Sequence, residues 1–166
     1  MKILLYGFGP YGKFKENVSE KIVEQTAKKF SNVSAVILPV EFDQQSFIET
    51  VEKYQPDLII GTGQHPRARK IRIERRAINQ LASKTRRPRK IKSSGKRVVF
   101  SSLKLKPGQG AYLSYNAGRF VCNYSMYVIG QWAQQHNVLY AFIHFPKNLE
   151  VKTGIKFLIN ALSQFN

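Results

Sequence analysis

Compact apolar runs alternate with segments of helical periodicity along the whole chain. The apolar runs have the length and composition of buried strands and cover residues 2–8, 33–40, 57–61 and 139–145. The segments between them space apolar side chains three and four positions apart and predict helices within residues 18–30, 44–54, 116–135 and 151–165. We therefore predict an α/β fold, a three-layer α/β/α sandwich with a mixed, mostly parallel central sheet, in one domain over residues 1–166.

Size and composition are consistent with such a core. A chain of 166 residues is long enough to bury roughly 70% of its unfolded surface. Its composition, with 43% hydrophobic residues, excludes collagen-like, coiled-coil and wholly disordered classes. No apolar run approaches the ~20 residues of a membrane span, and no signal-peptide core follows Met1. We expect a cytoplasmic protein that does not enter a membrane.

Positive charge is concentrated in one fifth of the chain. The net charge is +17, and residues 65–97 hold 14 of the 27 Lys and Arg residues with a single acid, Glu74. Within this segment, residues 84–97 lack apolar periodicity and predict an exposed basic loop. Such a loop is either a contact surface for nucleic acid or another polyanion, or a solvated loop without a partner. It contains no aromatic side chain on which bases could stack, so specific base reading is not expected.

A glycine-rich turn follows the first predicted strand. Residues 7–12 spell G-x-G-x-x-G, the pattern of dinucleotide-binding folds. In those folds a helix starts within the motif, whereas here Pro10 removes a donor and the helical pattern begins only near Val18. We therefore reject a dinucleotide site. Phe8 and Tyr11 lie on this turn and are placed to wall a small apolar pocket.

Three residues far apart in the chain carry the chemistry of a thiol hydrolase. Cys122, the only cysteine, lies near the start of a predicted helix, where the helix dipole favours a thiolate, although a lone cysteine on a helix is more often inert core. His144 ends an apolar strand and is either a buried neutral histidine or a general base. With Glu74 they supply a nucleophile, a base and an orienting carboxylate.

Four ordered blocks resemble the pyroglutamyl-peptidase I (pyrrolidone-carboxylate peptidase) family of cysteine peptidases. GFGPYG at residues 7–12 is similar to its G-F-x-P-F-G turn, and residues 63–79 to its G-Q and I-x-x-E-R-x-A-x-N segments. Residues 116–123 resemble its A-G-x-x-x-C-N segment, and residues 142–146 its F-I-H-x-P segment. The resemblance implies a cysteine exopeptidase that releases the N-terminal pyroglutamyl residue of peptides, needs no metal or organic cofactor and forms an oligomer.

The resemblance also implies residue roles. Cys122 is the nucleophile, His144 the base and then the acid, and Glu74 the carboxylate that orients His144. The residues expected to bind the pyroglutamyl ring are Phe8, Tyr11, Phe120 and Val121 as apolar walls, Gln64 as a hydrogen-bond partner of the lactam amide, and Asn17. Amides at the helix start stabilise the oxyanion, and surrounding arginines favour ionised Cys122 and Glu74.

The chain departs from the family pattern in length and charge. It is shorter than typical members, and the family's arginine near the nucleophile has no clear counterpart, so Arg86 and Arg87 are candidates for an oxyanion or anion contact. The departures leave a second hypothesis open. In it the peptidase scaffold has weak or no hydrolytic activity and binds nucleic acid or another polyanion through residues 65–97.

Overall fold

A mixed six-stranded sheet forms the centre of the protein. The computed structural model describes residues 1–83 and 87–165. The sheet has the order β2-β1-β3-β8-β4-β7, with β1 (Ile3–Phe8), β2 (Val33–Leu38), β3 (Leu58–His65), β4 (Ile71–Glu74), β7 (Ala111–Ser114) and β8 (Leu139–Pro146). Strands β2, β1, β3 and β8 are parallel, β4 is antiparallel to β8, and β7 is parallel to β4. The predicted mixed, mostly parallel sheet is confirmed.

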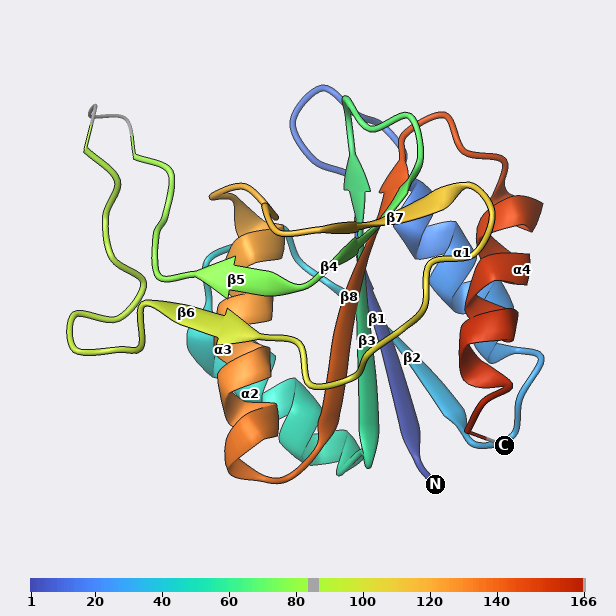
Figure 1. The fold of residues 1–166 in the computed structure, drawn as a ribbon, viewed down its shortest axis with the longest axis horizontal. Helices are drawn as coiled ribbons and strands as arrows, with labels where there is room; N and C mark the ends of the chain where they lie inside the picture. The colour runs from blue at the N-terminus through green and yellow to red at the C-terminus, as the bar shows by residue number, and fades with distance from the viewer. Residues whose placement is uncertain (84–86, 166) are drawn as a thin grey trace.

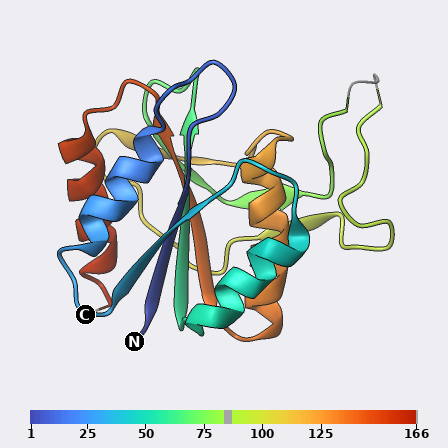
Figure 2. The same ribbon diagram turned by 180° about the vertical axis from the view of Figure 1, so that it is seen from behind.

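Four helices cover the two faces of the sheet. Helices α1 (Val18–Ala27) and α4 (Val151–Leu162) pack together on one face, and α2 (Gln44–Tyr54) and α3 (Val121–Gln135) on the other, as Figures 1 and 2 show. The bounds of α2 are those predicted. Helices α1 and α4 each end three residues early, and in α1 the chain then tightens into turns with i to i+3 hydrogen bonds.

Four short strands were not predicted from the pattern. They are β4, β7, and the two-stranded antiparallel sheet of β5 (Arg76–Ile78) and β6 (Val98–Phe100), which packs against α3. Each has only three or four residues, too few for a period-two pattern to stand out. Their strand conformation depends on pairing with distant segments, such as β8 for β4.

The basic segment projects from the body of the protein. The chain between β5 and β6 extends beyond α3 in both views of the ribbon (Figures 1 and 2). Its described part, residues 79–83 and 87–97, is joined by a backbone pair between Leu81 and Arg89, and Asn79 bonds Lys92 through both side-chain atoms. Most side chains of residues 87–97 are exposed.

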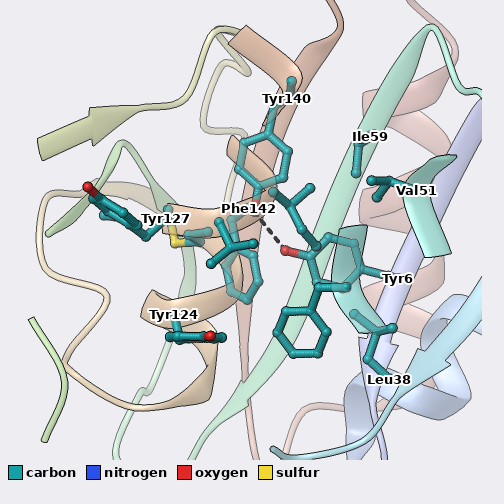
Figure 3. Close-up of a cluster of buried hydrophobic side chains, with 14 of the residues drawn as sticks. Tyr6, Leu38, Val51, Ile59, Tyr124, Tyr127, Tyr140 and Phe142 are labelled. Carbon is teal, nitrogen blue, oxygen red and sulfur yellow. Dashed lines mark hydrogen bonds between the residues drawn. The ribbon is translucent and has the colours of Figure 1, made fainter. Parts of the chain in front are cut away.

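The core face beneath α2 and α3 is built from aromatic rings. Figure 3 shows Tyr6, Tyr140 and Phe142 meeting there, with a 2.7 Å hydrogen bond between the Tyr6 and Tyr140 hydroxyls. A side chain at Gly61 would have its Cβ 2.3 Å from the Tyr6 ring, so glycine is needed for this packing. The close packing of β1, β3 and β8 fixes the strand ends that carry the functional side chains.

Among residues 1–83 and 87–165, no helix combines the length and apolar character needed to cross a membrane.

Candidate active site

The carboxyl ends of three parallel strands meet the start of α3 around one cavity. Phe8 ends β1, Gln64 and His65 end β3, and His144 lies near the end of β8, opposite Gly63 in the strand register. The cavity has a volume of about 300 Å³. Its described lining residues are Phe8, Tyr11, Asn17, Val40, Gln64, His65, Pro66, Arg67, Ala117, Gly118, Arg119, Phe120, Val121, Cys122 and His144.

A buried carboxylate is hydrogen-bonded to the imidazole of His144. Strand β4 runs antiparallel to β8 and brings Glu74 beside it, with 2.8 Å between Glu74 Oε1 and His144 Nδ1. Burial by itself raises the pKa of Glu74, but the hydrogen bond and charge of His144, together with Ser114 and Arg72, outweigh it and lower the pKa. Glu74 is therefore ionised at neutral pH and holds Nδ1 of His144 as the donor.

Cys122 lies in the first turn of α3, whose start is free of side-chain caps. The helix begins at Val121, and no side chain bonds its first amides. The N–H groups of Val121, Cys122 and Asn123 thus have no partner within the helix and point toward its N-terminal end. Such a helix start favours an anion near the sulfur.

Gly63 shows how closely the thiol and the imidazole approach. A Cβ atom at this position would lie 2.7 Å from Cys122 Sγ and 3.3 Å from His144 Cδ2. Sulfur and ring therefore flank the same point of β3, and only glycine leaves room for both. The structure brings Cys122, His144 and Glu74 into one cluster beside the apolar cavity.

The ionisation expected for Cys122 is wrong. Burial raises the pKa of its thiol to about 12, and the negative charge of Glu74 adds to the increase. The partly buried guanidinium of Arg72 is paired with Glu74, while Arg67 and Arg119 are exposed and screened by solvent. Cys122 thus rests as a thiol, and its proton has to leave during nucleophilic attack.

The expected apolar residues line the cavity. Phe8 and Val121 are buried in its floor, and Tyr11 lies on the turn after β1 against Phe14. Phe120 is 52% exposed at the rim, where its ring meets Phe42 edge to face at 5.7 Å. These rings form an apolar slot next to the thiol.

Gln64 and Asn17, the two amide side chains expected at the site, form different hydrogen bonds. Gln64 Oε1 accepts a 3.0 Å hydrogen bond from the backbone N–H of Val18, which orients its side-chain amide. Asn17 uses all its polar atoms to order the start of α1, accepting from Ser19 N and Oγ and donating to Gly9 O. Asn17 therefore supports the turn that carries Tyr11, whereas Gln64 lines the cavity, where its side chain also hydrogen-bonds Tyr11.

Of the two arginines expected near the nucleophile, only Arg87 lies in the part of the chain that the structure describes. Arg86 lies outside the described residues. Arg87 is exposed on the projecting segment and is not among the described lining residues, whereas Arg67 and Arg119 are. Arg87 belongs to the chain between β5 and β6, which projects beyond α3 in Figure 1.

Arg72 and His65 were missed by the sequence analysis. Arg72 Nε lies 3.0 Å from Glu74 Oε1, and its Nη1 donates to His65 Nε2 at 2.8 Å. Burial first, then the charges of His144 and Arg72, lower the pKa of His65 to about 4, so His65 is neutral at pH 7. Arg72 and Glu74 are two residues apart, so in a strand their side chains lie on the same face. Prediction of β4 as a strand would therefore have indicated that Arg72 lies beside Glu74.

No group of three or more His, Cys, Asp or Glu side chains suited to hold a metal ion occurs in the described part of the chain.

A thiol beside an imidazole, a buried carboxylate bonded to that imidazole, and a helix start without a side-chain cap are the groups that thiol hydrolases use. Comparison with known proteins identifies the family to which the chain belongs. The family model for pyroglutamyl peptidase matches residues 1–154. The chain therefore belongs to the pyroglutamyl peptidase family and is a cysteine-type exopeptidase, as its four sequence blocks predicted.

Individual relatives can be aligned with most of this chain. It is 32% identical to pyrrolidone-carboxylate peptidase 1 of Saccharolobus solfataricus, over 98% of this chain and 87% of that protein. It is 31% identical to the pyrrolidone-carboxylate peptidase of Lactobacillus acidophilus, over 88% and 84%. The crystal structure of Bacillus amyloliquefaciens pyroglutamyl peptidase I matches with a TM-score of 0.86 and 26% identity, over 97% of this chain and 95% of that one.

Proposed function

We propose that this protein removes the N-terminal pyroglutamyl residue from peptides by acyl transfer through Cys122. The observation that carries the proposal is the approach of the Cys122 sulfur and the His144 ring to the same point at Gly63, with His144 bonded to Glu74. A neutral lactam ring fits a slot walled by apolar side chains, because it needs only one or two polar partners.

The first half of the reaction forms a thioester. The lactam ring lies between Phe8, Tyr11, Phe120 and Val121, and the Gln64 amide donates to the lactam carbonyl. Because Nδ1 of His144 donates to Glu74, Nε2 is the basic nitrogen and accepts the thiol proton as sulfur attacks the pyroglutamyl carbonyl. The amides of the first turn of α3 stabilise the oxyanion.

The second half releases the products. The imidazolium of His144 gives its proton to the leaving amine as the C–N bond breaks, and the shortened peptide departs. Neutral His144 then removes a proton from a water molecule that attacks the thioester. Collapse of the second tetrahedral intermediate returns that proton to sulfur and releases pyroglutamate, which restores the Cys122 thiol.

The proposal is tested with two fluorogenic amides that differ only at the ring. We expect hydrolysis of the pyroglutamyl amide, and hydrolysis of the prolyl amide slower by about 10³-fold or more, since proline lacks the lactam carbonyl that Gln64 bonds and brings a charged amine into an apolar slot. Equal hydrolysis of the two amides, or hydrolysis of neither, would contradict the proposed function.

We propose in addition that the basic segment binds a polyanion. The exposed cations of residues 87–97 lie on a part of the chain that projects into solvent, which favours this role. Retention on heparin is expected to fall steeply with salt, and a variant with Arg89→Gln and Lys90→Gln to elute earlier than one with Lys152→Gln and Lys156→Gln on α4. Retention that does not change with salt, or that is equal in both variants, would contradict polyanion binding by the basic segment.

Because catalysis needs a free thiol, we propose the cytoplasm as the place where this protein acts.

A further inference from the structure

Two arginines place positive charge at the rim of the active-site cavity. Two guanidinium groups line the cavity, Arg67 after β3 and Arg119 before α3, and both side chains are exposed. Among the described lining residues there is no Asp or Glu. His65, which also lines the cavity, is uncharged at pH 7 because its pKa is lowered to about 4.

The position of the ring slot indicates on which side of the sulfur the peptide leaves. The ring-binding residues Phe8 and Tyr11 belong to β1 and the turn after it, at one side of the reacting sulfur. The leaving amine takes its proton from His144, which lies on β8, farther along the sheet from β1. The residue after the pyroglutamyl group therefore lies on the β8 side of the sulfur, away from the ring slot.

A second hollow continues the cavity on its cationic side. It has a volume of about 520 Å³ and shares Ala117, Gly118 and Arg119 with the active-site cavity. Arg76 lines it as well, and no acid is among its described lining residues. The backbone that separates the two hollows is held in place, since Gly118 adopts a positive φ of 80° and Arg119 O accepts a 2.7 Å bond from Ala82 N.

We infer that the enzyme prefers pyroglutamyl peptides whose next residue is acidic, with Arg119 and Arg67 as the residues that recognise the carboxylate. This inference rests on the proposed function and names the substrate class of the same site. Arg119 is three residues before Cys122 and lines both the active-site cavity and the second hollow. Guanidinium groups bind carboxylates through paired N–H donors, which a neutral side chain cannot reproduce.

The size of the preference follows from the exposure of the two arginines. Ion pairs in contact with solvent are weak and are screened by salt. We therefore expect kcat/KM for a peptide with glutamate in second position to exceed that of its glutamine isostere by about fivefold at low ionic strength. A lysine in second position is expected to be the poorest of the three, because it meets like charge at the rim.

The experiment compares tripeptides that carry pyroglutamate first, alanine third, and glutamate, glutamine or lysine second. Release of free amino groups is followed for the native protein, for Arg119→Gln, Arg67→Gln and the double variant, and for Lys152→Gln as a charge-matched control on the opposite face of the sheet. The ratio of kcat/KM between the glutamate and glutamine peptides is expected to approach one in the double variant and at high salt, and to keep its native value in Lys152→Gln.

The outcomes separate this inference from the proposed function. Equal rates on the glutamate and glutamine peptides in the native protein, or an unchanged ratio in the double variant, would overturn the acidic preference while hydrolysis remains. Absence of hydrolysis of all three peptides would overturn the proposed function, and the preference with it.

Discussion

Cys122→Ala is expected to reduce hydrolysis of a pyroglutamyl amide to background, a loss in kcat of about 10⁴-fold or more. No other cysteine exists in the chain to replace the sulfur, and acyl transfer cannot begin without it. The rings of Phe8, Tyr11 and Phe120, which line the same cavity, are retained in this variant. Binding of free pyroglutamate, measured by calorimetry, is therefore expected to persist.

Two controls distinguish loss of the nucleophile from loss of the folded structure. The side chain of Cys122 is half-buried, so its truncation is expected to cost only about 1 kcal/mol of unfolding free energy. Cys122→Ser keeps the volume and is expected to be nearly as inactive, because a hydroxyl lacks the nucleophilicity of sulfur in this site. Native rates in Cys122→Ala would remove the thiol from the mechanism.

Glu74→Gln is expected to lower kcat by about 10²-fold to 10⁴-fold. A neutral amide does not stabilise the imidazolium that His144 becomes during attack, and its NH₂ group can hold Nδ1 in the acceptor state, which leaves the wrong tautomer for Nε2. The measurement is the kcat of both proteins over a pH series. A Glu74→Gln variant with native kcat throughout would exclude an orienting role for this carboxylate.

The same variant is expected to change how stability depends on pH. The folded-state pKa of Glu74 is lowered, so the carboxylate stabilises the fold above its unfolded pKa, and this contribution is lost as pH falls through the folded pKa. Glu74→Gln also leaves the guanidinium of Arg72, 13% exposed, without its ion pair, at a cost of about 3–5 kcal/mol at neutral pH. Urea unfolding across acidic pH is expected to show the gap to the native protein narrowing toward low pH.

Glu16→Gln is the matched control for this measurement. Glu16 pairs with Lys21 at 2.8 Å, but its side chain is 72% exposed. Solvent screens such a pair, so the variant is expected to unfold like the native protein at every pH. Equal pH profiles for Glu74→Gln and Glu16→Gln would contradict the stabilising role of the buried carboxylate.

Local sequence determined much of the architecture. The alternation of apolar runs with amphipathic segments was enough to place the long strands and the helices, and the bounds of α2 were predicted to the residue. These elements are long and strongly periodic, so a few residues of context specify them. The positions of Cys122 after a glycine turn and of Phe8 at the end of a strand are likewise local features.

Only the tertiary structure decided how the chemistry is arranged. Strands of three or four residues, such as β4, exist because distant segments pair with them, and β4 brings Arg72 and Glu74 to His144. Desolvation by the surrounding fold made Cys122 a resting thiol where charge counting had suggested a thiolate. Contacts between residues far apart in the chain and the burial they create are absent from any local pattern, which is why these features required the fold.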